Sequence, residues 1–278
     1  PDVAVITNIG TAHIEFLESR ENILKAKMEI IEHFTSSNTL IINGDDDMLK
    51  TIKNKDFVII SIGLNKENNI YAFDIKQVEN KGMEFCVKIG EKAESFYIPL
   101  IGMHNVYNGL CAIAVGINMG MSFEKIKHGL SGFVSPNMRM ESFISDNGIT
   151  VINDAYNANP QSMEAAMETL INIQNKARKV LILGDMMELG KHSEIEHYKV
   201  GKLAASKKID VLITIGERSK RIQKGALENG MLKVFHFENN QKAIDYLMNI
   251  LLPFDTVLIK GSRAAKMEEI AYFLQERR

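Results

Sequence analysis

The chain has 278 residues, of which 45% are hydrophobic and 24% are charged, and its formal net charge at pH 7 is −2. These values are average for a globular protein, and a chain of this length is expected to form two domains. Without a block of Lys and Arg, nothing supports nucleic-acid or membrane-surface binding, and no apolar run approaches the roughly 20 residues of a transmembrane helix.

Residues 1–136 are predicted to form an α/β domain with a mainly parallel sheet and a small antiparallel meander. Apolar runs ending in polar residues indicate buried strands, and Ser19 is a plausible N-cap for the helix that follows the first run. The pattern predicts strands at 3–8, 39–47 and 56–63, a meander over 70–100, and helices at 19–34, 104–120 and 123–133.

Residues 137–278 are predicted to form a second, Rossmann-like α/β domain, because the pattern resets near Pro136. Two strands come first, and apolar strands then alternate with helices, which favours a parallel sheet covered on both faces. Ligands bind at the carboxyl ends of such strands. The polar residues of this sequence fall there, at Asn153–Asp154, Gly184–Asp185, Gly216 and 260–263.

Two common nucleotide-binding loops are missing from these residues. The stretch from Gly184 to His192 resembles a phosphate loop, but its glycines are one residue too far apart and His192 replaces the magnesium-binding Ser or Thr. No G-x-G-x-x-G follows a predicted strand, which disfavours a dinucleotide-dependent oxidoreductase.

In the first domain, His13 follows a strand and Lys27 lies in the next predicted helix. A neutral imidazole could bind a cation and the lysine could neutralise phosphate, although a surface or packing role is the commoner one for such residues. Asn105 could cap the helix that begins near His104. Asn108 lies one turn into that helix, where its amide could pair with a backbone carbonyl or with a purine base.

In the second domain, Arg139 and Asp154 flank the first two strands. They could form a structural salt bridge. Alternatively, Arg139 could bind a phosphate and Asp154 a ribose or an ammonium group. Asn157 and Asn159 suit turns because asparagine tolerates unusual backbone angles, and Pro160 suits a first helical position. Turn chemistry leaves Asp154 and Tyr156 unexplained.

Lys260, Ser262 and Arg263 lie at a joint between a strand and a helix. Such a joint can bind a carboxylate or a phosphate through its side chains and backbone amides. A basic loop that only caps the helix explains these residues equally well.

Five stretches occur in order along the whole chain: TNIGTAHIE with KAKMEI, GMHNVYNGLCA, NMRMES with INDAYNANPQSM, LGDMMELG, and KGSRAAKMEE. Together they resemble the ATP-dependent Mur ligases of bacterial cell-wall synthesis. DAYNANP followed by LGDMMELG is similar to the member that adds D-Ala-D-Ala. The resemblance implies an α/β fold with a central ATPase domain over 1–136 and a Rossmann-like C-terminal domain over 137–278.

The resemblance also implies roles for individual residues. Asn108 would contact adenine, Arg139 the phosphates and Asp154 the ribose. His13 would bind a second magnesium ion, together with Lys27 after carbamylation. Tyr156, Asn157 and Asn159 would shape the side on which the incoming substrate binds. The D-Ala-D-Ala pocket would be lined by Asp185, Lys260, Ser262 and Arg263.

The implied reaction is ATP-dependent: the terminal carboxylate of UDP-MurNAc-tripeptide is phosphorylated, and the amine of D-Ala-D-Ala attacks the acyl phosphate. Magnesium would offset the repulsion between the two anions. We expect a cytoplasmic monomer with reduced Cys86 and Cys111. The family's Gly-rich phosphate loop and sugar-nucleotide domain should precede Pro1, so we expect a fragment that is inactive alone. A folylpolyglutamate synthase-like ligase and a non-catalytic binding module are the alternatives.

Overall fold

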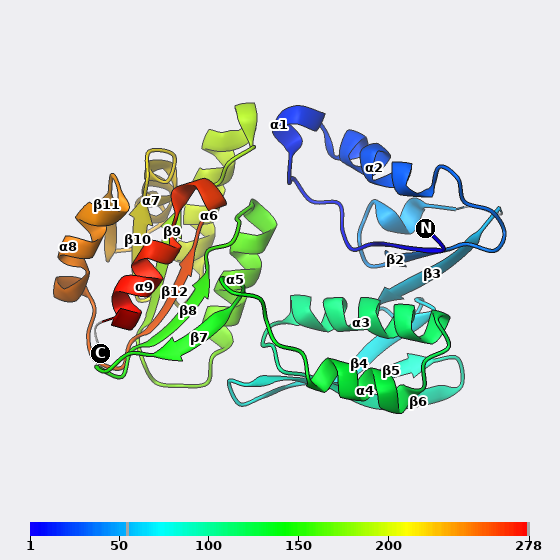
Figure 1. The fold of residues 1–278 in the computed structure, drawn as a ribbon. Helices are drawn as coiled ribbons and strands as arrows, with labels where there is room; N and C mark the ends of the chain where they lie inside the picture. Colours follow the sequence, from blue (N-terminus) through cyan, green and yellow to red (C-terminus); the bar gives the residue numbers. More distant parts are fainter. Residues whose placement is uncertain (54–55, 277–278) are drawn as a thin grey trace. The chain divides into compact units, whose positions relative to one another are not determined.

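The computed structural model describes residues 1–53 and 56–276, which divide into two compact units (Figure 1). The first unit contains Pro1–Gly10 and Leu17–Val134, and the second contains Thr11–Phe16 and the chain from Ser135 onward. The sequence pattern did not indicate that Thr11–Phe16 belongs with the second unit. Domain limits at 1–136 and 137–278 stay a prediction. Within the described ranges, no helix is long and apolar enough to cross a bilayer.

The first unit is built on a six-stranded sheet with the order β1-β2-β3-β4-β5-β6. Strands β1 to β4 pair in parallel, and β4, β5 and β6 pair antiparallel, which confirms the predicted meander. The elements of this unit are β1 (Val3–Ile6), α2 (Arg20–Met28), η1 (Glu29–Ile31), β2 (Thr39–Asn43), η2 (Leu49–Thr51), β3 (Val58–Gly63), β4 (Ile70–Val78), β5 (Gly82–Ile89), β6 (Lys92–Ile98), α3 (Met103–Asn118) and α4 (Phe123–Ser131).

Helix α3 covers this sheet because its apolar residues recur at helical spacing. Val106, Leu110, Ile113 and Ala114 are completely buried and join the core with side chains from β2 to β6. The predicted N-cap at Ser19 is confirmed, since its side chain accepts a hydrogen bond from the backbone N–H of Asn22.

The second unit contains a sheet with the order β11-β10-β9-β12-β8-β7. All neighbouring strands are parallel except β7 and β8, which form an antiparallel hairpin because no helix separates them in the chain. The elements are α1 (Ile14–Leu17, whose last residue belongs to the first unit), β7 (Glu141–Ile144), β8 (Thr150–Asp154), α5 (Pro160–Asn172), β9 (Lys179–Gly184), η3 (Gly190–His192), α6 (Ser193–Ser206), β10 (Val211–Ile215), α7 (Lys220–Glu228), β11 (Val234–Phe237), α8 (Asn240–Ile250), β12 (Thr256–Lys260), η4 (Arg263–Ala265) and α9 (Glu268–Glu276).

Helices cover both faces of this second sheet (Figure 1). Every residue of β9, β10 and β12 is buried, so both faces of these strands are shielded from water. Alternate strand residues such as Val180 and Ile182 pack with α8 and α9. The predicted α/β class, with a parallel Rossmann-like sheet in the second half, is confirmed.

Candidate functional site

The carboxyl ends of β8 and β12 meet in a buried ion pair. The sheet register places Lys260, the last residue of β12, beside Asp154, the last residue of β8. The Lys260 Nζ lies 2.6 Å from Asp154 Oδ2, with side-chain exposures of 4% and 16%. At this burial neither charge is well solvated, so each depends on the other.

The same two side chains hold the turn that follows β8. Lys260 Nζ also donates to the backbone oxygen of Asn157 at 3.0 Å, and Asp154 Oδ1 accepts from the backbone N–H of Met140 at 3.3 Å. The structural salt bridge considered for Asp154 and Arg139 is therefore wrong, because the partner of the carboxylate is Lys260. Lys260, which the resemblance assigns to the D-Ala-D-Ala pocket, is buried.

Arg139 lies over the aromatic ring of Tyr156. The Cζ atom of the guanidinium is 4.1 Å from the ring centroid, a cation–π contact. In the described part of the chain, the guanidinium makes no hydrogen bond or ion pair, and the side chain is exposed. Its five N–H donors can therefore bind an anion.

Asn159 and Pro160 begin helix α5. The Asn159 side chain accepts from the backbone N–H of Ser162, whose hydroxyl accepts from the backbone N–H of Asn159, and Pro160 is the first helical residue as predicted. Neither asparagine adopts the left-handed backbone angles that this residue type tolerates: Asn159 is extended, with φ −143°, and Asn157 is absent from the residues with positive φ. Asn159 is a helix cap, so its amide oxygen is occupied.

The stretch after β9 is fixed by backbone and side-chain contacts. The carboxylate of Asp185 accepts from the backbone N–H of Ser219 at 2.7 Å, and its backbone oxygen accepts from the N–H of Ser262 at 2.9 Å. The backbone N–H of Met186 donates to His197 Nε2 at 3.0 Å. Asp185 is 9% exposed, which leaves little of it open to a ligand.

Sequence reasoning missed His197, which is completely buried on α6. Its Nδ1 lies 2.7 Å from the backbone oxygen of Ser193 and donates to it, because Nε2 accepts from Met186. Burial lowers the pKa of His197, which keeps the ring neutral. A signal existed: His197 shares helical spacing with the buried Val200, Gly201 and Ala204.

Ser262 and Arg263 follow β12. Ser262 is 1% exposed, and its hydroxyl has no hydrogen-bond partner among the described residues. Arg263 is more accessible, and its Nη1 binds Glu268 Oε1 at 2.8 Å. Ser262 and Arg263 thus lie beside Asp185 and Asp154 at one edge of the sheet, as the strand pattern predicted.

His13 contacts the stretch that follows β9. Its Nδ1 lies 2.5 Å from Glu188 Oε2, and the backbone N–H of Glu15 donates to the Glu188 oxygen at 3.1 Å. The hydroxyl of Thr11 donates to Gln161 Oε1 at 3.1 Å. His13 and Glu188 have φ values of 63° and 60°, so both occupy the left-handed region.

Lys27 and Asn108 belong to the first unit. Lys27 Nζ donates to the backbone oxygen of Asn8 at 2.8 Å, and desolvation of its amino end lowers the pKa, an effect that the charge of Asp46 partly offsets. Asn108 is exposed, and its Nδ2 donates to Asn105 Oδ1 at 3.1 Å. Asn105 is not the N-cap that the sequence allowed, because α3 begins at Met103.

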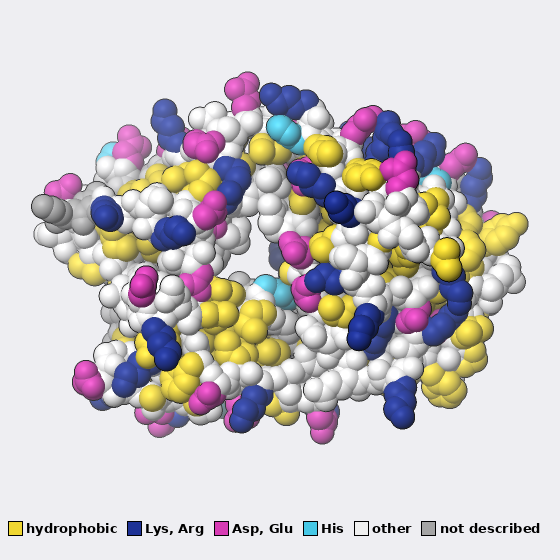
Figure 2. All heavy atoms as spheres, turned by 180° about the vertical axis from the view of Figure 1, so that it is seen from behind, with side chains coloured by type: hydrophobic (Ala, Val, Ile, Leu, Met, Phe, Trp, Pro, Cys, Tyr) yellow, Lys and Arg dark blue, Asp and Glu magenta, His cyan; other side chains and the backbone are white. Residues whose placement is uncertain are grey.

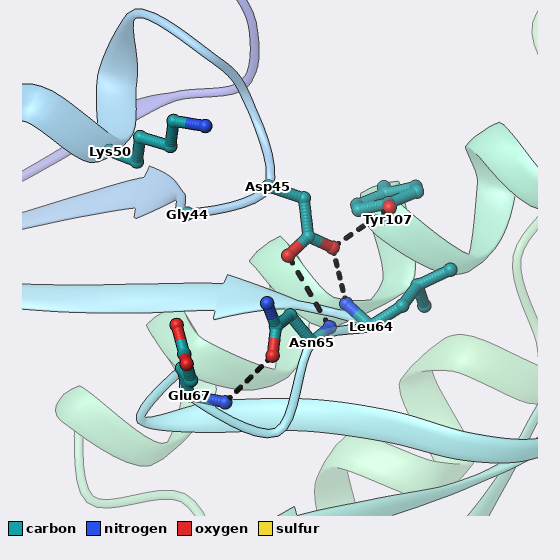
Figure 3. Close-up of a pocket in the computed structure, with 7 residues that line it drawn as sticks. All are labelled: Gly44, Asp45, Lys50, Leu64, Asn65, Glu67 and Tyr107. Atoms are coloured by element: carbon teal, nitrogen blue, oxygen red, sulfur yellow. Dashed lines mark hydrogen bonds between the residues drawn. The ribbon is translucent and has the colours of Figure 1, made fainter.

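A polar cavity of about 720 Å³ lies at the carboxyl ends of β2 and β3, lined by Gly44, Asp45, Lys50, Leu64, Asn65, Glu67 and Tyr107 (Figure 3). The Asp45 carboxylate accepts from the backbone N–H groups of Leu64 and Asn65, from Asn68 Nδ2 and from the Tyr107 hydroxyl. Burial alone would raise the pKa of Asp45, but these hydrogen bonds outweigh it and lower the pKa. Asp45 is therefore a structural anchor within the cavity.

In the described ranges, no group of three or more His, Cys, Asp and Glu side chains could hold a metal ion. His13, the predicted magnesium ligand, is already bound to Glu188. The roles of His13 and Lys27 as magnesium ligands stay a prediction.

On the face drawn in Figure 2, Lys and Arg side chains are interspersed with Asp and Glu.

Two family descriptions match consecutive parts of the chain: the Mur ligase middle domain over residues 1–116, and the Mur ligase, glutamate ligase domain over residues 138–263. The chain belongs to the Mur ligase family. The family expectation from the five sequence stretches is thereby confirmed, and the two matches cover the two halves in the order in which the units occur.

Individual Mur ligases match over nearly the whole chain. The UDP-N-acetylmuramoyl-tripeptide–D-alanyl-D-alanine ligase of Bacillus subtilis (strain 168) is 37% identical over 280 residues, covering 99% of this chain and 60% of the relative. The ligase of the same name from Escherichia coli (strain K12) is 32% identical, covering 99% and 60%. A crystal structure of MurF from Acinetobacter baumannii has a TM-score of 0.87 and 30% identity, covering 99% and 60%.

The chain thus spans about 60% of the length of the relatives that it matches. The similarity therefore extends over one part of each relative.

Proposed function

We propose that this chain is the nucleotide-binding and acceptor-binding part of an ATP-dependent ligase that joins D-Ala-D-Ala to UDP-MurNAc-tripeptide. The observation that carries the proposal is the 37% identity over 99% of the chain to a ligase of that name. The terminal carboxylate of the tripeptide would attack the γ-phosphate of ATP and release ADP. The amine of D-Ala-D-Ala would then attack the acyl carbon, and phosphate would leave as the amide forms.

Residues of both units support this proposal: Arg139 and Asp154 at the carboxyl edge of the second sheet, and Asn108 on helix α3. The guanidinium of Arg139 has free donors for the phosphates of ATP, and a bidentate contact of that kind is charge-assisted. Asp154 keeps a partly exposed carboxylate, held in place by Lys260, to which a ribose hydroxyl could donate. Asn108 offers an exposed amide, a group that pairs well with adenine.

The family resemblance assigns the acceptor side more broadly to Tyr156, Asn157, Asn159, Asp185, Lys260, Ser262 and Arg263. Of these, Arg263 is the accessible cation, and it suits the carboxylate of a dipeptide. The Ser262 hydroxyl has no partner among the described residues, but it is buried. Buried Lys260 and the helix cap Asn159 would act by holding the turn.

Magnesium belongs to the same proposal, with His13 and carbamylated Lys27 as ligands. A bound magnesium ion would reduce the repulsion between the tripeptide carboxylate and ATP. The lowered pKa of Lys27 favours the neutral amine that reacts with carbon dioxide. Because the described residues hold no complete metal site, further ligands would come from ATP and from protein outside this chain.

We also propose that the protein is a cytoplasmic monomer in which Cys86 and Cys111 are free thiols.

The proposal is tested by ADP release in a protein that carries this chain together with the remainder found in its relatives. We expect ADP to form only when ATP, UDP-MurNAc-tripeptide and D-Ala-D-Ala are all present, and the 278-residue chain alone to be inactive. Arg139→Ala should lower kcat/KM for ATP about 100-fold or more, because a preorganised donor to the phosphates is lost. Arg221→Ala, which removes an exposed pair with Glu194, is the matched control and should retain full activity.

Replacing D-Ala-D-Ala by glutamate separates the alternatives. Turnover with glutamate and not with the dipeptide would favour a folylpolyglutamate synthase-like ligase. Calorimetric binding of ATP or D-Ala-D-Ala without turnover in the longer protein would favour a binding module.

A further inference from the structure

We propose that Tyr156 is a positioning residue whose ring holds Arg139, and that its hydroxyl does not bind substrate. The inference rests on the proposed function, in which Arg139 contacts phosphate. It departs from the substrate-contact role that the family resemblance implied for Tyr156.

The cation–π contact leaves the hydrogen-bond donors of the guanidinium free. The Cζ of Arg139 lies 4.1 Å from the centroid of the Tyr156 ring, and the guanidinium makes no hydrogen bond or ion pair within the described ranges. The ring attracts the positive charge through its π face and supplies no oxygen or nitrogen acceptor. The side chain can thus be held in one orientation while all its donors remain available for an anion such as a phosphate.

The backbone around Arg139 is strained and is held by the same turn. Met138 and Met140, on either side of it, have φ values of 61° and 55°. Non-glycine residues in this left-handed region persist only where the surroundings fix them. Here the backbone N–H of Tyr156 donates to the Met138 oxygen at 3.1 Å, and the N–H of Met140 donates to Asp154 Oδ1 at 3.3 Å.

Lys260 fixes the opposite side of that turn. Its ammonium binds Asp154 Oδ2 and the backbone oxygen of Asn157, the residues on either side of Ala155–Tyr156. The ring of Tyr156 is therefore carried on a segment anchored at both ends. Tyr156 is 45% exposed, and its hydroxyl makes no hydrogen bond within the described ranges. The ring face, and not the hydroxyl, makes the contact seen in the structure.

Substitutions that keep or remove the ring test this role. In the longer ligase, Tyr156→Phe should retain the wild-type kcat/KM for ATP, because the ring face remains. Tyr156→Leu should lower it by about 2- to 30-fold, the range expected for a lost cation–π contact, and should leave KM for D-Ala-D-Ala unchanged. Tyr272→Leu is the matched control, since Tyr272 on α9 is 44% exposed, and it should behave as the wild type.

An equal loss of kcat/KM for ATP in Tyr156→Phe and Tyr156→Leu would overturn the proposal in favour of a contact made by the hydroxyl. So would a rise in KM for D-Ala-D-Ala in Tyr156→Leu without a change in kcat/KM for ATP. Thermal unfolding of each variant identifies any that fails to fold.

A second measurement is independent of ligase activity. In NMR spectra of the 278-residue chain, the Arg139 side-chain protons should be shifted upfield by the ring in the wild type and in Tyr156→Phe. The shift should disappear in Tyr156→Leu, and Arg139→Lys assigns the resonances. Unchanged Arg139 resonances in Tyr156→Leu would overturn the stacking even in an active ligase. An inactive wild-type ligase with the expected shifts would instead contradict the proposed function alone.

Discussion

The pair of Lys260 and Asp154 gives the sharpest expectation for a single residue. Lys260→Met leaves the Asp154 carboxylate without its ammonium partner in a site where the lysine side chain is 4% exposed. We expect the second unit to lose about 3–5 kcal/mol in its free energy of unfolding, the typical cost of an uncompensated buried charge. Urea unfolding followed by a probe in the second unit measures it.

A double variant isolates the origin of that loss. Lys260→Met combined with Asp154→Leu should recover part of the stability, since no unpaired charge remains. Lys220→Met, which breaks an exposed pair with Glu217, should leave stability unchanged. Wild-type stability of Lys260→Met alone would show that the carboxylate is satisfied without the lysine.

Residue identities indicated where the site lies but not how its side chains pair. Asp154, Asp185 and Lys260 were expected at the carboxyl edge because apolar strands of parallel sheets end in polar residues. The stacking of Arg139 on Tyr156 could not be predicted, since it depends on the left-handed conformation of Met138 and Met140, for which methionine is not a signal.

At the scale of elements, Asp45 joins β3, the turn after it and helix α3 to the end of β2. The four donors come from Leu64, Asn65, Asn68 and Tyr107. Gly63 permits this arrangement, because a Cβ there would lie 2.5 Å from Asp45 Oδ2.

Asp45→Asn should destabilise the first unit by about 1.5–3 kcal/mol, because an amide offers one accepting oxygen where the carboxylate offers two with a full charge. Denaturant unfolding of the first unit measures the change. Asp47→Asn removes a carboxylate that is 61% exposed, and it should have little effect on stability. If the two variants unfold alike, Asp45 does not join these elements.

The order of elements was easier to predict than their ends. Alternation of apolar strands with helices indicated the second sheet, and the period-two pattern over 70–100 indicated the meander. The four-residue α1 gave no such signal, because it is too short to show a helical period. The partner of Glu15 in this helix, Glu188, is far away in the sequence, as is Gln161, which accepts a hydrogen bond from the nearby Thr11.

At the scale of the whole chain, the two units should respond to acid in different pH ranges. In the second unit, burial lowers the pKa values of His197 and His236 below 6.5. As the pH falls, the unfolded chain therefore takes up protons at these two histidines before the folded chain does. The stability that the neutral histidines contribute is complete above pH 6.5 and falls as the pH drops below it. In the first unit, the pKa of Asp45 is lowered from its ordinary value of 3.8, so the stability that its carboxylate contributes is lost only below pH 3.8.

Hydrogen exchange at about pH 7.5 and 5.5, corrected for intrinsic rates, checks this expectation. Amides of β9 and β10 should lose protection at the lower pH while those of β2 and β3 keep it. His197→Gln should flatten the pH dependence of the second unit, and His33→Gln, at an exposed position, should not. Equal loss of protection in both units would contradict the assignment to His197 and His236.

The segment Thr11–Phe16 also determines how the chain can be dissected. The polypeptide passes from one unit to the other three times, after Gly10, Phe16 and Val134. Neither unit is therefore a single uninterrupted stretch of sequence. A recombinant piece that starts at Ser135 omits residues that bind Gln161 and Glu188, leaving these side chains to water. The shortest continuous stretch that encloses the entire second unit begins at Thr11, and it includes most of the first.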